Sequence, residues 1–223
     1  MSAFAGELAG RNKMNVQKDI VKRGCLLVAG LFICGFGVAI IRRGSLGVSP
    51  ISSVANVLSL RFPSLSFGVW LMIWNCILIL GQALVLGRNF RLVELLQLPL
   101  SVLFGWFTDI GVRIAELLPA EAYILRLLWV ILGIFVMALG ICLSVKADLI
   151  MNSGEAFVKA VSARTGREFG NVKIVFDISC VLLSIVLSLL LFSGQIVGTR
   201  EGTLLSAVGT GLAVKLFFRL LPH

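Results

Sequence analysis

The chain alternates between long apolar runs and short polar segments. Six runs are long enough to cross a membrane, at about residues 24–41, 68–86, 92–110, 127–145, 172–192 and 201–221. A transmembrane helix needs about 20 apolar residues to span the hydrocarbon core of a bilayer. The pattern therefore predicts an all-α, polytopic membrane protein with six transmembrane helices.

The composition excludes a soluble globular domain. Hydrophobic residues make up 58% of the 223 residues and charged residues only 14%, with a mean hydropathy of +1.02. A water-soluble domain of this composition would lack the polar side chains needed to cover its surface. The net charge of +9 could suggest nucleic-acid binding, but most basic residues lie between the apolar runs. We therefore expect the lipid bilayer as a partner and no nucleic acid.

The distribution of Lys and Arg predicts an orientation in the membrane. Residues 1–23 form a basic N-terminal arm, and no small-residue cleavage site ends the first apolar run, so we interpret that run as a retained helix. If the arm is cytoplasmic, most of the 20 Lys and Arg residues lie on the cytoplasmic side. The positive-inside rule then places both termini in the cytoplasm.

The stretch GSLGVSP, residues 44–50, contains a helix-start signal between the first two spans. Ser49 is a preferred N-cap, and Pro50 suits the first helical position because its missing N–H would have no partner there. A short helix is therefore predicted from Pro50 to about Leu60.

A second interruption, DLIMNSGE at residues 148–155, occupies the corresponding place in the other half. Asn152 is the matching N-cap, and Glu155 follows three residues later, as in a capping box. Both predicted helices are too short to span a bilayer at about 1.5 Å per residue. They either lie flat at the interface or enter the bundle as broken, re-entrant helices.

The two halves of the chain share one plan. The first half covers residues 24–110 and the second covers 127–221, with 111–126 as an extracytoplasmic linker. At an offset of 103 residues, Gly37 matches Gly140, and other matches follow in the same order. Because each half has three spans, an odd number, the halves must insert in opposite orientations. This is the inverted-repeat plan of many secondary transporters.

The basic N-terminus, the glycine-rich first span, the GxLGxSP stretch and the degenerate second copy resemble the bacterial YczE/YitT-type integral membrane proteins. The resemblance covers about residues 20–220, and GSLGVSP is its most specific part. It implies a multi-pass protein of the bacterial cytoplasmic membrane. The molecular activity of that family is poorly defined, so the resemblance implies no substrate.

Two helix N-termini that approach one point from opposite sides would favour an anionic solute, because their free N–H groups carry partial positive charge. The candidate substrate-binding residues are those at the two helix starts together with one polar residue in the second span. They are Gly44, Gly47, Ser49, Ser52, Asn75, Asn152, Ser153 and Gly154.

Three acidic residues in the second half of the chain are candidates for ion coupling, because carboxylates at membrane depth are expensive and are often functional. They are Asp148, Glu155 and Asp177. Each also has a structural interpretation. Glu155 could only cap its helix, Asp148 could face Lys146 in interfacial water, and Asp177 could form a buried pair with Lys173.

The function that fits best is a small secondary transporter that moves a polar, anionic or zwitterionic metabolite by alternating access. A substrate-binding membrane subunit of a multi-component importer and a non-transporting helper protein remain alternatives. We expect no enzyme, cofactor or metal site, because His223 is the only histidine and the chain has no nucleotide loop. A stripe of small residues predicts close helix packing, within one subunit or in a homodimer: Gly198, Gly202, Ser206 and Thr210.

Overall fold

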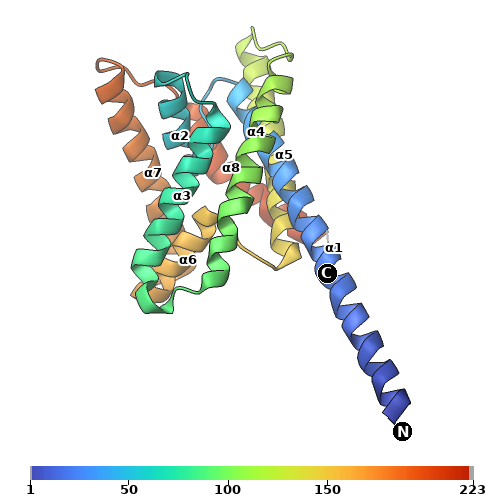
Figure 1. Cartoon of the computed structure of the whole chain (residues 1–223). Coiled ribbons are helices and arrows are strands. Elements are labelled where there is room, and N and C mark those ends of the chain that lie inside the picture. The colour runs from blue at the N-terminus through green and yellow to red at the C-terminus, as the bar shows by residue number, and fades with distance from the viewer. Residues whose placement is uncertain (1, 221–223) are drawn as a thin grey trace.

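The computed structural model describes the backbone of residues 2–220 and the side chains of residues 19–220. This part of the chain contains eight α-helices, two short 3-10 helices and no strand. Six of the α-helices include a segment long and apolar enough to cross a membrane, which confirms the predicted all-α, polytopic class (Figure 1). The elements are α1 (Ser2–Arg43), α2 (Pro50–Arg61), α3 (Phe67–Leu86), η1 (Gly87–Asn89), η2 (Leu92–Leu96), α4 (Gln97–Ala115), α5 (Tyr123–Ala147), α6 (Ser153–Thr165), α7 (Phe169–Leu191) and α8 (Glu201–Leu220).

The spans lie close to the predicted positions, with two differences at their ends. The first span, Asp19–Arg43, is part of a single helix that starts at Ser2, so the predicted N-terminal arm continues into the span without a break. That stretch contains no proline that would interrupt a helix. α4 continues to Ala115 and α5 begins at Tyr123, so the connection between the halves covers only residues 116–122.

α1 and α5 pack side by side, in antiparallel directions, through glycines. A Cβ atom on Gly30 would lie 2.9 Å from the carbonyl oxygen of Gly140, and one on Gly133 would lie 2.8 Å from the carbonyl oxygen of Gly37. Only glycine permits this approach, and close backbone packing is what holds helices together in lipid.

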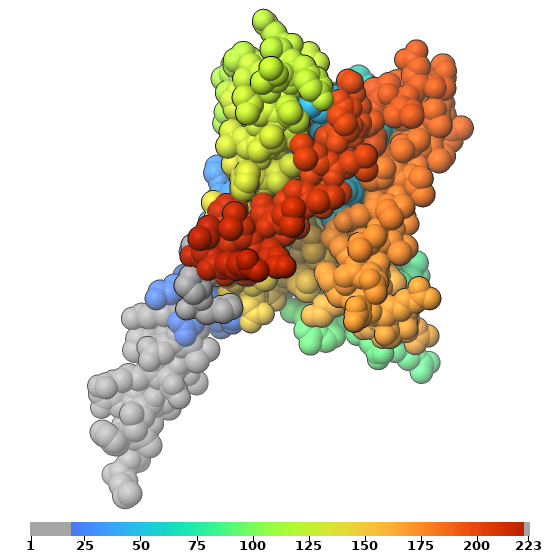
Figure 2. Space-filling view, turned by 180° about the vertical axis from the view of Figure 1, so that it is seen from behind, coloured from blue at the N-terminus to red at the C-terminus, as the bar shows by residue number. Residues whose placement is uncertain are grey.

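Two of the other long helices, α4 and α8, flank this pair. α4 packs against α1, α8 packs against α5, and α3 packs against α4. Figure 2 shows α8 in red crossing the molecule obliquely and α7 in orange at its edge. We call the side where α1 ends the Arg42 side, and the opposite side, where α5 ends, the Asp148 side.

Each of the two short helices packs against two long helices of the bundle. α2 packs against α3 and α7 and reaches the Arg42 side, while α6 packs against the same two helices and reaches the Asp148 side (Figure 1). Their N-terminal ends meet, because a Cβ atom on Gly154 would lie 2.8 Å from Cδ1 of Ile51. The chain therefore turns back into the bundle after α1 and again after α5.

The two helix starts use different caps. As predicted, the Asn152 side chain caps α6, with its Oδ1 accepting a hydrogen bond from the N–H of Ser153 at 2.9 Å. Ser49 stands at the N-cap of α2 as predicted, but its side chain does not cap the helix. Its hydroxyl donates to Ser52 Oγ at 2.9 Å instead, so a side-chain pair replaces the expected contact with the backbone.

Candidate functional site: a cavity with three arginines

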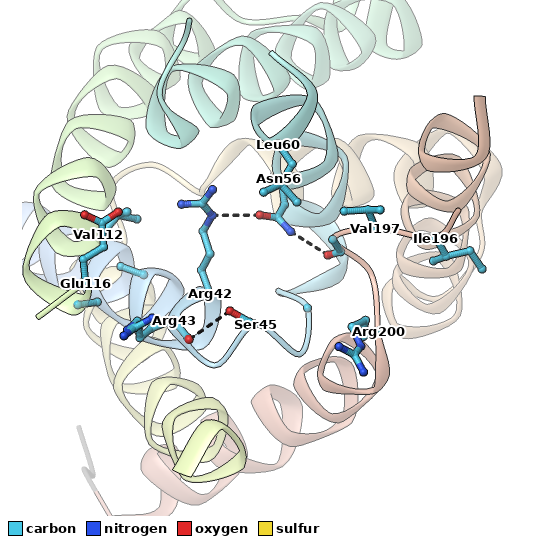
Figure 3. A pocket seen from close by; sticks show the side chains of 14 residues that line it. Arg42, Arg43, Ser45, Asn56, Leu60, Val112, Glu116, Ile196, Val197 and Arg200 are labelled. Carbon is cyan, nitrogen blue, oxygen red and sulfur yellow. Dashed lines mark hydrogen bonds between the residues drawn. The ribbon is translucent and has the colours of Figure 1, made fainter. Parts of the chain in front are cut away.

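A cavity of about 430 Å³ opens on the Arg42 side between α1, α2, α4 and the connection from α7 to α8 (Figure 3). This volume is within the usual range for small-molecule sites. The lining combines apolar side chains with a ring of charged and polar ones. It consists of Ala39, Arg42, Arg43, Ser45, Gly47, Asn56, Leu60, Val112, Ala115, Glu116, Ile196, Val197, Gly198 and Arg200.

Arg42 is held in place from two sides. Its Nε donates to Asn56 Oδ1 at 3.0 Å and its Nη2 donates to Ser59 Oγ at 3.4 Å. The guanidinium also lies 4.6 Å from the centre of the Phe67 ring, a cation–π distance. Asn56 in turn donates from Nδ2 to the carbonyl oxygen of Gly198 at 2.8 Å, so Arg42 and Asn56 link α1, α2 and the segment before α8.

Arg43 and Arg200 add two further guanidinium groups. Arg43 donates from Nε to the carbonyl oxygen of Leu118 at 2.8 Å and from Nη2 to the same oxygen, which fixes the connection between α4 and α5. Arg200 approaches Glu201 at 3.4 Å, with both side chains about half exposed. Each arginine therefore comes from a helix end or a connection, where its charge can reach water.

Glu116, at the C-terminal end of α4, supplies the only carboxylate in the lining. It is exposed and forms no ion pair within 4.0 Å among the described residues. Three guanidinium groups and one carboxylate give the cavity a positive balance. Such a site favours a ligand with at least one anionic group, since guanidinium pairs well with carboxylate and phosphate.

Among the predicted substrate-binding residues, Gly47 lines this cavity. Its φ of +110° and its contact with α8 both require glycine, since a Cβ atom would lie 3.0 Å from the nitrogen of Thr203. Gly44 instead packs on α5, where a Cβ atom would lie 2.6 Å from the carbonyl oxygen of Arg126. Ser49 and Ser52 bond to each other at the start of α2.

Three of the other predicted substrate-binding residues lie at the start of α6, and the fourth lies on α3. Asn152 is exposed and caps the helix, Ser153 is 1% exposed with an unpartnered hydroxyl, and Gly154 touches Ile51. Asn75, on α3, is 3% exposed and its Nδ2 has no partner. The structure thus brings the two helix starts together through an apolar side chain, while the cavity lies on the Arg42 side.

The three predicted ion-coupling residues have different surroundings. Asp148 caps α5 in the left-handed conformation and pairs with Arg23 at 2.8 Å, its side chain 82% exposed. Asp177 pairs with Lys173, Nζ to Oδ1, at 2.6 Å, so its predicted structural partner is confirmed. Glu155 has a buried Oε2 with no hydrogen-bond partner.

The carboxyl group of Glu155 is electrostatically unusual. It lies in the first turn of α6, a helix too short to span a membrane, and the side chain is partly buried there. Burial raises the pKa of this carboxyl group, and Asp177 adds to the rise. The ammonium of Lys173 opposes it, as do hydrogen bonds from the N–H of Glu155 itself and from the side chain of Asn152. The neutral form of Glu155 is therefore favoured relative to a carboxyl group in water.

Sequence reasoning missed most of the cavity. Arg42, Arg43, Asn56, Glu116 and Arg200 are not among the candidates selected from the sequence. The available signal was the pair of arginines that directly precedes the GSLGVSP stretch. The contact between Asn56 and Gly198, 142 residues apart, depends on tertiary packing and has no local signal.

The fold and the cavity define a polytopic helical membrane protein with a positively charged cavity on one side. Residues 21–219 match the family of unknown function DUF6198, and the chain belongs to this family. The chain matches no curated protein and no solved structure.

Proposed function

We propose that the protein is a small secondary transporter that binds an anionic or zwitterionic metabolite in the arginine cavity. The observation that carries this proposal is the lining itself: Arg42, Arg43 and Arg200 all line one cavity of about 430 Å³. Residues of both halves of the chain contribute to it. A binding site between two halves is the arrangement that alternating access needs.

The packing of α1 and α5 supports an inverted repeat. Gly30 and Gly133 are 103 residues apart, as are Gly37 and Gly140, and the contacts pair Gly30 with Gly140 and Gly37 with Gly133. This exchange of partners is expected when two equivalent elements meet across a two-fold axis. α2 packs on α7 and α6 packs on α3, which fits the same relation.

The charge distribution supports an orientation. The positive-inside rule favours the Asp148 side as cytoplasmic, so the arginine cavity opens to the outside of the cell and both termini lie in the cytoplasm. The similarity to YczE/YitT-type proteins, which stays a prediction, would place the protein in a bacterial cytoplasmic membrane. A homodimer and the absence of enzymatic activity also stay predictions.

The cavity is tested first by binding. The full chain, purified in lipid nanodiscs, is screened by thermal shift against small carboxylates, inorganic phosphate and zwitterionic amino acids. We expect stabilisation by at least one of these compounds. Arg200→Gln removes one exposed guanidinium and should weaken that binding roughly tenfold, about 1.5 kcal/mol for a charge-assisted hydrogen bond.

The matched control is Arg61→Gln, because Arg61 is also exposed on the Arg42 side but does not line the cavity. Equal weakening by both substitutions, or no stabilisation by any anionic or zwitterionic compound, would contradict the proposed site. Uptake of the bound compound into proteoliposomes then separates the functions. Binding without uptake would replace the transporter proposal by an importer subunit or a helper protein.

A further inference from the structure

The start of α6 holds a second polar region, separate from the arginine cavity. Glu155 lies in the first turn of α6, and its Oε2 has neither solvent contact nor a hydrogen-bond partner. In the same turn, Ser153 is 1% exposed and its hydroxyl also has no partner. Buried polar atoms of native proteins are normally hydrogen-bonded, so these two require an explanation.

The charges around Glu155 do not balance. On α7, Lys173 and Asp177 already form an ion pair of 2.6 Å. α3, the other long helix packed against α6, has no Asp, Glu, Lys or Arg between Phe67 and Leu86. Two carboxylates therefore share one ammonium group, and one negative charge remains without a partner inside the bundle.

Other titratable groups do not change this balance. α1 brings the thiol of Cys34 close enough to interact electrostatically with Glu155, and a thiol supplies no positive charge. The first turns of α2 have no charged residue, and Lys159, on α6 itself, is exposed. Hydrogen bonds from the Asn152 side chain and from the N–H of Glu155 itself reach this carboxyl group but supply no positive charge. A buried carboxylate without a full ion pair binds a cation or a proton, because an unpaired buried charge is strongly unfavourable.

The surroundings favour a proton over a metal ion. The described residues contain no group of three or more His, Cys, Asp or Glu side chains able to hold a metal ion. The ammonium of Lys173 also interacts electrostatically with Glu155, and this positive charge would repel a metal cation at the same place. A proton needs only one carboxylate oxygen, and it turns that oxygen into a hydrogen-bond donor.

We infer that Glu155 is a proton-binding site and that its proton moves together with the solute. The coupling rests on the proposed transport function, whereas proton binding itself does not. α2 contacts both regions, since Ile51 at its start touches Gly154 and Asn56 holds Arg42. A negative solute at the arginines and a proton at Glu155 would then cross with less net charge.

Proton binding is tested by infrared spectroscopy on the full chain in nanodiscs. At neutral pH we expect a carbonyl-stretch band from a protonated carboxyl group, which disappears as the pH is raised. Glu155→Gln should remove the band, Glu155→Asp should shift it, and Asp148→Asn should leave it unchanged because Asp148 is exposed. Folding of each variant is verified by size-exclusion chromatography.

Three results would overturn the inference. They are the absence of a protonated carboxyl band in the wild type, a band that survives Glu155→Gln, and a band that disappears in Asp177→Asn but survives in Glu155→Gln. If Glu155→Gln does not fold, the shift in Glu155→Asp decides the assignment.

Coupling is tested with the compound identified by thermal shift. An inward proton gradient should accelerate its uptake by the wild type, and Glu155→Gln should bind the compound but lose this acceleration. Arg200→Gln should show the opposite pattern, with weakened binding and an intact infrared band. A band without any uptake would leave Glu155 as a proton site and reject transport, while gradient-driven uptake unchanged in Glu155→Gln would reject the coupling.

Discussion

The arginine cavity and the start of α6 surround their charged groups with opposite environments. In the cavity, Arg42 is engaged by Asn56 and Ser59 and borders a space that opens on one side. At α6, Glu155 and Ser153 each have a buried oxygen atom without a hydrogen-bond partner. The arginine cavity is organised around the permanent positive charge of Arg42. The start of α6 is organised around the carboxyl group of Glu155, whose negative charge a proton can neutralise. Substitutions should therefore affect the two regions differently.

The largest effect is expected at the helix pair on which both regions depend. In Gly37→Leu the new side chain would collide with α5, because even a Cβ atom would lie 2.5 Å from Cα of Met137. We expect a loss of about 3 kcal/mol or more, seen as loss of the monodisperse peak in size-exclusion chromatography. Gly170→Leu is the matched control, since nothing lies within 4 Å of its Cβ position. Equal yields of the two variants would disprove the close crossing.

A smaller effect is expected in the cavity. Arg42→Lys keeps the charge but loses the fixed hydrogen bonds to Asn56 and Ser59, since lysine does not reproduce the planar guanidinium. The free energy of unfolding should fall by about 2 kcal/mol, measured as a lower thermal midpoint. Arg61→Lys, at an exposed position, should change it by less than about 0.5 kcal/mol. If both variants behave alike, Arg42 is not the anchored charge described here.

The smallest effect is expected at the exposed carboxylate that the sequence grouped with Glu155. Asp148→Asn removes the charge that pairs with Arg23, but an exposed pair contributes only about 0–1 kcal/mol. Asn also tolerates the φ of +46°, whereas Asp148→Ala should cost about 1 kcal/mol more at this left-handed position. Thermal midpoints at low and high salt distinguish these contributions. A large salt-independent loss in Asp148→Asn would show that Asp148 belongs with Glu155 after all.

The sequence predicted the elements better than the site. The six spans and the start of α2 at Pro50 follow from hydropathy and local capping rules, and the structure agrees. The cap of α2 differs because the Ser49 hydroxyl prefers a side chain to the backbone. The cavity depends on side chains that meet only after α2 folds back into the bundle, such as Asn56 and the segment before α8. Capping rules and hydropathy describe local sequence and do not predict contacts between residues that are far apart in the chain.

The packing of α7 determines which of its positions can be substituted during evolution. Its buried residues are Cys180, Ser184 and Ser188, spaced four apart. Ser184 shares a hydrogen bond with Thr199 at 2.8 Å, and Ser188 holds the connection to α8. Much of the rest of the helix faces outward, as at Leu190, which is 75% exposed. Natural variation in α7 should therefore exchange one apolar residue for another almost freely, while a stripe of three small residues stays nearly constant.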